Sequence, residues 1–179
     1  HWPAFEAVDR REVMQFVEHK AFKKIHVRGL DDDMIPIMDA VFLRKWKRMP
    51  DGSKVVKSRL CIRGCFDHQK HLIPTKATTA TRLTQRMIVS MSGILGFSME
   101  SWDVSGAFLK GFSFDKNKKV FDKMGIRSPK RKVVIQLPSN VWRHFNASSD
   151  TSLHINMAAV LEWLVIALKP VYGLGDAPL

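Results

Sequence analysis

The pattern of hydrophobic and polar positions along the chain predicts helices and strands in an irregular order. Residues 5–21 place apolar side chains near one helical face and charged side chains on the other, as in an amphipathic helix that packs on a core. Residues 25–27 predict a short strand. A second helix is expected to begin at a threonine at position 78, 79 or 81 and to end near Leu95. We expect its buried side to carry Leu83, Met87, Ile88, Met91 and Leu95.

The strongest local prediction is a β-hairpin. Two β-prone runs, residues 41–49 and 54–63, flank a turn that contains Asp51 and Gly52, a pair typical of hairpin turns. Cations alternate with apolar or small residues in the second run, so the two-residue period of a strand puts most of them on one face. The hairpin carries the densest group of cations in the chain, namely Arg44, Lys45, Lys47, Arg48, Lys54, Lys57, Arg59 and Arg63. This face is either a solvated sheet edge or a phosphate-binding surface.

The middle of the chain is organised around one acidic residue. The apolar run 94–99 predicts a strand that leads into Asp103, and a short turn of helix is expected over residues 107–109. Residues 111–132 are polar and rich in lysine, which favours an insertion or a flexible loop.

The last third of the chain predicts two short strands. Residues 133–138 form an apolar run that ends at a proline, and residues 164–168 form another. Between them, residues 139–162 favour a loop, with one helix near residues 157–163. No internal repeat is evident.

Composition narrows the class of partner. The 179 residues include 29 Lys and Arg against 17 Asp and Glu, a net charge of +12, which favours nucleic acid before an acidic membrane surface. No apolar run reaches about 18 residues, and the N-terminus lacks a secretory pattern, so we expect an intracellular protein, cytoplasmic or nuclear and not secreted, with no membrane segment. Two cysteines give no disulfide framework. The sequence begins with His and closes on a loop-like run, so we expect a piece of a longer protein.

Three groups of residues are candidate metal ligands. Asp103 follows an apolar run and precedes Ser and Gly, a position suited to a helix N-cap or to a metal ligand. The aspartates at positions 31–33 are interpreted as a solvated turn or cap rather than a metal site. The spacing of Cys61, Cys65, His68 and His71 suggests zinc, but all four fall within a short segment, which favours a strand end and a polar loop.

The ordered set of motifs resembles the reverse transcriptase domain of copia-type LTR retrotransposon polyproteins. The pieces are the hairpin with D-G at 51–52 and K-S-R-L at 57–60, the helix after Pro74, D-V-S-G-A-F-L-K-G at 103–111 and Y-G-L-G-D-A-P at 172–178. The resemblance covers about residues 5–179. The motif at 103–111 is moderately specific, and its combination with the last motif is strongly so.

The resemblance implies an α+β fold, the fingers and incomplete palm of a right-hand polymerase, with a basic hairpin and helices on a small antiparallel sheet. Residues 1–98 would be the fingers-like region, and residues 99–179 the partial palm with its lysine-rich insertion. The implied reaction is template-directed nucleotidyl transfer with two Mg²⁺ ions. The implied partners are an RNA or DNA template-primer, dNTPs and the remainder of the polyprotein.

The resemblance also assigns roles to single residues. Asp103 would be catalytic and would bind both metal ions, with the backbone carbonyl of Val104 as a further ligand. Phe108 would lie under the incoming sugar. The remaining assignments are Lys57 and Arg59 to the triphosphate, Tyr172 and Gly173 to the nucleotide and template pocket, and Arg44, Lys45, Lys47 and Arg63 to the nucleic-acid backbone.

The chain also departs from the family pattern. The second acidic motif, with two adjacent aspartates, would follow the 172–178 motif and does not occur in the sequence, so we expect the chain alone to be inactive. Residues 133–140 lack the acidic and tyrosine features usual at that place. The alternative is a non-catalytic, basic nucleic-acid-binding module from a decayed or domesticated element.

Overall fold

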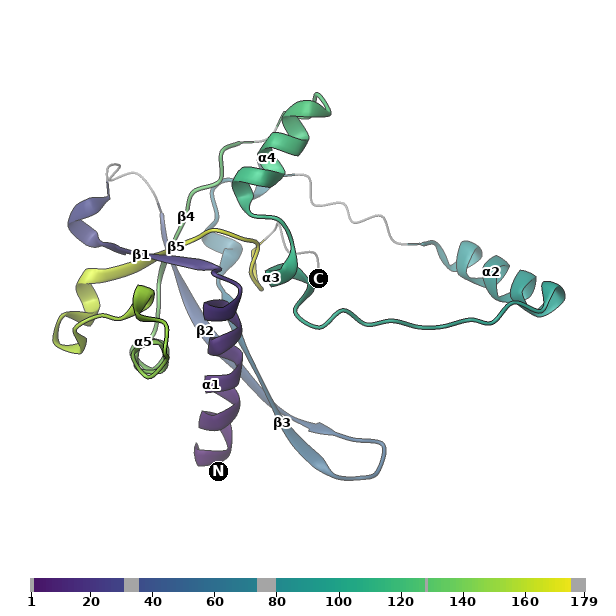
Figure 1. Cartoon of the computed structure of the whole chain (residues 1–179), viewed down its shortest axis with the longest axis horizontal. Coiled ribbons are helices and arrows are strands. Elements are labelled where there is room, and N and C mark those ends of the chain that lie inside the picture. The colour runs from purple at the N-terminus through teal and green to yellow at the C-terminus, as the bar shows by residue number, and fades with distance from the viewer. Residues whose placement is uncertain (1, 31–35, 74–79, 128, 175–179) are drawn as a thin grey trace.

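A computed structural model describes residues 2–30, 36–73, 80–127 and 129–174. Its centre is a five-stranded sheet in the order β1-β5-β4-β2-β3 (Figure 1). The strands are β1 (Phe22–His26), β2 (Ile37–Arg48), β3 (Lys54–Ile62), β4 (Val133–Gln136) and β5 (Trp163–Ala167). The α-helices are α1 (Trp2–Glu18), α2 (Arg82–Leu95), α3 (Ala107–Lys110), α4 (Phe114–Lys123) and α5 (Ser139–Asn146). Short 3-10 turns are η1 (Val27–Gly29), η2 (Gly64–Phe66), η3 (Lys70–Leu72), η4 (Thr151–Leu153) and η5 (Met157–Glu162).

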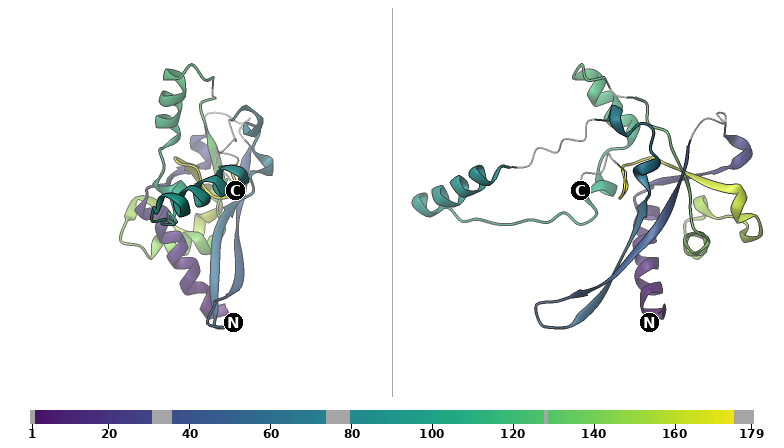
Figure 2. Two further views of the ribbon diagram at one scale, coloured as in Figure 1. Left: turned by 90° about the vertical axis from the view of Figure 1, so that its right-hand side faces the viewer. Right: turned by 180° about the vertical axis from the view of Figure 1, so that it is seen from behind.

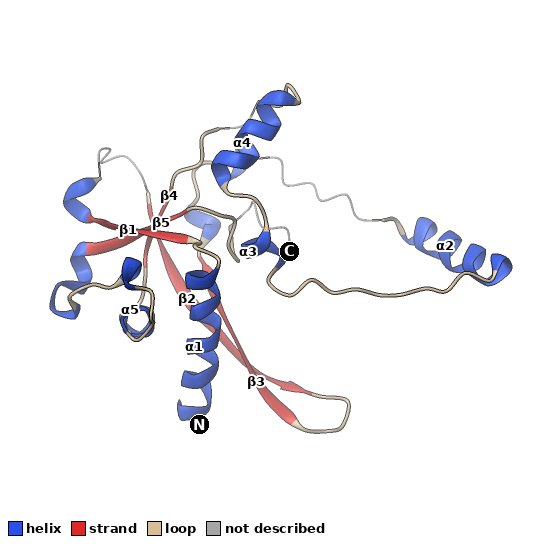
Figure 3. Cartoon of the chain, viewed as in Figure 1, coloured by secondary structure: helices blue, strands red, loops and turns tan. Residues whose placement is uncertain are grey.

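The α+β class is therefore present, but the sheet is mixed rather than antiparallel. Strands β2 and β4 run parallel, whereas the other neighbouring pairs are antiparallel. The parallel pair follows from the long crossover between Arg48 and Val133, which contains β3 and three helices. The same sheet joins strands from residues 1–98 with strands from residues 99–179 (Figure 3).

The core lies between the sheet and helices α1 and α5. Val13 and Phe16 of α1 are fully buried, which confirms the apolar face predicted for this helix. Phe16 stacks on Phe22 of β1, with ring centroids 5.0 Å apart. Helix α5 buries Trp142 and its neighbours in a stretch for which the sequence favoured a loop. Its eight residues form an amphipathic surface too short to stand out by periodicity.

The predicted hairpin is confirmed. Strand β2 pairs with β3 from Ala40–Ile62 to Arg48–Lys54, and Gly52 takes the left-handed backbone conformation at the turn. The side chains of Ser58, Leu60 and Ile62 are buried, so the two-residue alternation also holds. The apolar half of β3 therefore packs on α1, and the alternating positions carry the cations.

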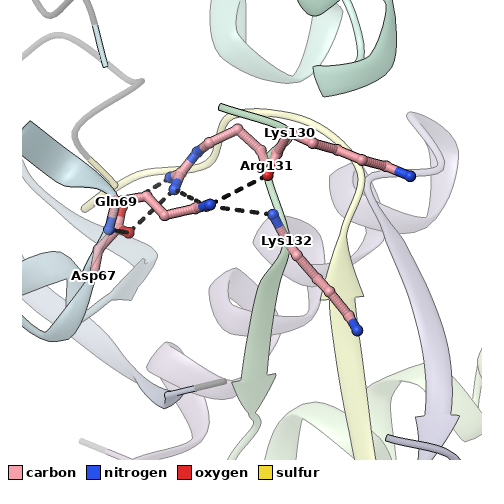
Figure 4. Close-up of polar contacts among 5 residues, drawn as sticks. All are labelled: Asp67, Gln69, Lys130, Arg131 and Lys132. Atoms are coloured by element: carbon pink, nitrogen blue, oxygen red, sulfur yellow. Dashed lines mark hydrogen bonds and ion pairs between the residues drawn. The ribbon is translucent and has the colours of Figure 1, made fainter. Parts of the chain in front are cut away.

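Part of the lysine-rich segment is folded rather than loop. Residues 114–123 form α4, and the segment after it is tied to the loop beyond β3 (Figure 4). The guanidinium of Arg131 donates to both carboxylate oxygens of Asp67, at 3.1 and 2.8 Å, and to Gln69 Oε1. The side chains of Asp67 and Arg131 are only 3% and 6% exposed. This buried pair fixes the entry to β4.

Helix α2 differs most from expectation. Its bounds and its cap, Thr81, agree with the prediction. However, the helix lies away from the sheet, as both sides of the molecule show (Figures 1 and 2). Its apolar side chains are therefore exposed, not buried, in the described structure: Leu83, Met87, Ile88, Met91 and Leu95.

The strand predicted before Asp103 is also absent. Ile94 and Leu95 end α2, Gly96 caps that helix in the left-handed conformation, and residues 97–104 have no regular structure. An apolar run becomes a strand only where another strand pairs with it, and none of the described strands reaches this segment. None of the helices in the described ranges has the length and apolar content needed to cross a membrane.

Candidate functional site

The residues assigned to metal and nucleotide binding come from three distant segments and line one cavity of about 590 Å³. We call it the β3-edge cavity. The assigned residues in its wall are Lys57, Arg59, Asp103, Val104, Phe108, Tyr172 and Gly173. Residues between them and two positions on α1 complete the wall: Glu12, Gln15, Ser58, Ser105, Gly106 and Ala107.

The cavity lies along the outer edge of β3, where backbone groups have no neighbouring strand. The Leu60 N–H donates to Glu12 Oε1 at 3.3 Å, and the Ile62 N–H donates to the Tyr172 carbonyl oxygen at 2.8 Å. By the two-residue period of the strand, the Ser58 N–H faces the same edge. Helix α1 and the segment after β5 thus cover the edge on either side of the cavity.

Two glycines allow the segment after β5 to approach this edge. Gly173 has a φ of +94°, and a Cβ there would collide with the Ile62 carbonyl oxygen. A Cβ on Gly64 would collide with the Gly173 carbonyl oxygen. Only glycine can adopt the left-handed conformation and also lie this close to the Ile62 carbonyl oxygen. The glycine of the Y-G pair is therefore required by the local structure.

The ring of Tyr172 holds two other residues of the cavity. The guanidinium carbon of Arg59 lies 4.9 Å from the ring centroid, a cation–π distance. The ring of Phe108 meets the same ring edge-on, with centroids 5.5 Å apart. The predicted triphosphate cation and the predicted sugar-facing aromatic residue are thus both in contact with Tyr172.

Asp103 reaches the cavity from an exposed, irregular segment. The chain then turns at Gly106, which has a φ of +64°, and enters α3. Leu109 of α3 is buried and anchors this turn in the core. Asp103 is therefore held by the turn that follows it and not by a strand that precedes it.

Glu12 gives the cavity a second carboxylate. Burial raises the pKa of Glu12 above its ordinary value of 4.5, against the opposing effects of the Leu60 N–H, Arg59 and Lys57. Glu12 lies on α1 and lines the cavity together with the two cations, Lys57 and Arg59. The cavity wall therefore combines two cations with two acidic residues.

This donor set does not fit a two-metal centre. Within the described residues, Glu12 and Asp103 are the carboxylates that line the cavity, and no group of three or more His, Cys, Asp or Glu side chains is arranged to hold a metal ion. Cys61, Cys65, His68 and His71 all lie within the described residues. The aspartates at positions 31–33 lie outside the described residues.

The four residues assigned to the nucleic-acid backbone lie outside the cavity wall. Arg44 forms an ion pair with the buried Asp9, and Arg63 forms one with Asp39. Lys45 and Lys47 are exposed on the other face of the hairpin from Arg44, and Lys45 lies directly across from Lys57. Their contact with nucleic acid stays a prediction.

Sequence reasoning assigned no role to six of the lining residues: Ser58, Ser105, Gly106 and Ala107, which lie inside the motifs, and Glu12 and Gln15, which lie outside them. Glu12 and Gln15 were interpreted only as the polar side of a packing helix. Their three-residue spacing puts them on neighbouring positions of one helix surface, beside the buried face of Val13 and Phe16. This spacing indicates residues at the edge of a core, but it does not show which strand they contact.

No family model, curated protein or solved structure matches this chain.

Proposed function

We propose that the β3-edge cavity binds the triphosphate of a nucleotide, and that the chain is part of an RNA-directed DNA polymerase similar to those of copia-type retrotransposons. One observation supports this most strongly. Residues 57–59, 103–108 and 172–173, chosen on motifs far apart in the sequence, line a single cavity. Motifs that matched by chance would have no reason to meet.

The cations of the cavity suit a polyphosphate. Lys57 offers a compact ammonium group, and Arg59 offers a planar guanidinium whose orientation is set by the Tyr172 ring. Guanidinium and ammonium groups form charge-assisted hydrogen bonds with phosphate oxygens, which are the strongest class in proteins. Phe108, which contacts the same ring, gives an apolar surface for the sugar.

Asp103 would bind Mg²⁺ that arrives with the phosphates, because Mg²⁺ is commonly held by one or two carboxylates together with substrate oxygens. Nucleotidyl transfer with two metal ions would need further carboxylates than those that line the described cavity. We therefore expect binding without polymerisation from this chain alone, and a role for the rest of the polyprotein in the reaction.

Calorimetric titration with dTTP tests the proposal. Lys57→Gln and Arg59→Gln should each weaken binding about tenfold or more, because each removes a charge-assisted contact. Lys54→Gln is the matched control, since it removes the same charge from an exposed position of the same strand outside the cavity. Equal losses at Lys54 and Lys57, or no dTTP binding by the parent chain, would contradict the proposal.

Asp103→Asn tests the metal contact separately. Mg²⁺ should strengthen dTTP binding by the parent chain, and this gain should be lost in the variant. Binding measured without Mg²⁺ should not fall in the variant, because the substitution removes a negative charge that repels the phosphates. A full Mg²⁺ gain in Asp103→Asn would assign the metal contact to another residue.

The alternative function is a non-catalytic nucleic-acid-binding module. The net charge of +12 and the small number of acidic groups in the cavity favour it. Oligonucleotide binding that weakens steeply with salt, but depends on neither Mg²⁺ nor dTTP, would select this alternative.

A further inference from the structure

A second cavity, of about 660 Å³, lies between α1, β2 and α5. We call it the α1–α5 cleft. Its α1 positions, Glu6, Asp9 and Arg10, lie on a different helical face from Glu12 and Gln15, which line the β3-edge cavity. Helix α1 therefore separates two cavities.

The most buried charge of the cleft is already neutralised within the protein. Asp9 is 2% exposed, and its carboxylate accepts hydrogen bonds from Arg44 Nε at 3.0 Å and Nη2 at 2.5 Å. Ser58 Oγ donates to the same carboxylate at 2.5 Å. Asp9 and Arg44 thus form a buried, hydrogen-bonded pair at the base of the cleft, and their charges cancel.

Two further arginines line the cleft and are exposed. Arg10 lies on α1, and Arg143 lies in the last turn of α5. Within the described part of the chain, neither side chain forms an ion pair. Glu6 is the acidic group that opposes them at the opening, so the wall outside the Asp9–Arg44 pair keeps a net positive charge.

His144 lines the cleft together with these charged groups. Burial lowers the pKa of the ring, and the charges of Arg10 and Arg143 lower it further, while Asp9 and Glu6 raise it. His144 is therefore a local probe of any charged group that enters the cleft.

We infer that the α1–α5 cleft binds a phosphate group between Arg10 and Arg143, independently of the β3-edge cavity. Guanidinium groups match phosphate oxygens with paired hydrogen bonds, and two of them on facing helices can hold one phosphate from both sides. The phosphate belongs either to a nucleic-acid strand or to a free nucleotide. Both sources present the same chemistry to the cleft.

The experiment compares two neighbouring arginines of α1. Binding of oligothymidylate and of ATP is measured for Arg10→Gln, Arg143→Gln and the control Arg11→Gln, each in a Lys57→Gln/Arg59→Gln background that disables the β3-edge cavity. Arg11 is exposed on the same helix but does not line the cleft. Failure of the proposed nucleotide site therefore leaves this comparison intact.

We expect Arg10→Gln and Arg143→Gln each to weaken binding about tenfold and, for the oligonucleotide, to reduce the salt slope by about one. Arg11→Gln should weaken it about twofold at most, and Glu6→Gln should strengthen it. An effect confined to oligothymidylate assigns the phosphate to a strand, and an effect on ATP alone assigns it to a nucleotide. Equal losses for Arg10→Gln and Arg11→Gln with both probes would overturn the inference.

The pKa of His144 gives a second measurement, which a change in overall net charge would not shift. The pKa of its ring, followed by NMR and assigned with a His144→Gln variant, should rise when the probe binds, because a phosphate beside the ring favours its protonated form. The rise should disappear in an Arg10→Gln/Arg143→Gln double variant. An unchanged ring pKa in the parent chain under saturating probe would place the phosphate elsewhere.

Discussion

At the scale of single residues, Gly173 is the position at which the structure most strictly requires glycine. We expect Gly173→Ala to lower the free energy of unfolding by about 2–4 kcal/mol, because it combines left-handed strain with a collision against the Ile62 carbonyl oxygen. Urea unfolding followed by circular dichroism measures this. Gly93→Ala is the matched control: its Cβ would meet nothing within 4 Å in α2, so it should be neutral or stabilise the chain by about 1 kcal/mol. A neutral Gly173→Ala would mean that residue 173 does not lie against β3.

Glu12 predicts a dependence of stability on pH. Because burial raises its pKa in the folded state, the folded chain holds the proton more tightly than the unfolded chain. The resulting stabilisation is complete below the unfolded value near 4.5 and is lost as the pH rises through the folded pKa. Glu12→Gln stays neutral throughout, so its stability relative to the parent should increase with pH over this range. Denaturant midpoints at a series of pH values provide the measurement, and parallel curves for the two proteins would contradict it.

Single residues were predictable from the sequence where a motif marks them. Asp103, Phe108 and Tyr172 stand in recognisable patterns, and they line one cavity. Glu12 and Gln15 belong to no motif and enter the cavity through the packing of α1 on β3. Such residues depend on a long-range contact, which periodicity cannot supply.

At the scale of elements, local signals predicted all five described strands and α1, α2 and α3. The Asp51–Gly52 turn and the Thr81 cap each depend on only a few neighbouring residues, and both form in the structure. Burial is different, because it depends on what an amphipathic helix meets. Helix α2 has an apolar face but no described element against it, so its buried side could not be predicted correctly from spacing alone.

The exposure of α2 leads to a direct test. Ile94 is 82% exposed, so Ile94→Ser should change the free energy of unfolding by no more than about 0.5 kcal/mol. Phe16→Ala, at a fully buried position of α1, should cost about 3–5 kcal/mol. Chemical denaturation of both variants gives the comparison. A loss above about 1.5 kcal/mol for Ile94→Ser would show that this face is covered in solution.

At the scale of the whole molecule, the mixed sheet could not be predicted from the sequence. Each strand was found locally, but the order β1-β5-β4-β2-β3 depends on pairings between the two ends of the chain. Strand β5 pairs with β1, and β4 enters beside β2 after a long crossover. The Arg131–Asp67 pair secures this crossover, and neither residue signals its partner in the sequence.

The contact between Tyr172 and Ile62 also sets an order of assembly. Strand β3 can form its hairpin with β2 as soon as both have been synthesised, but the part of its outer edge at Ile62 stays uncovered until the segment after β5 has left the ribosome. Until residues 172–173 have been made, the nascent chain thus carries a basic hairpin with a partly open edge. The β3-edge cavity is completed by residues 172–173, so it cannot bind a ligand before that segment has been made.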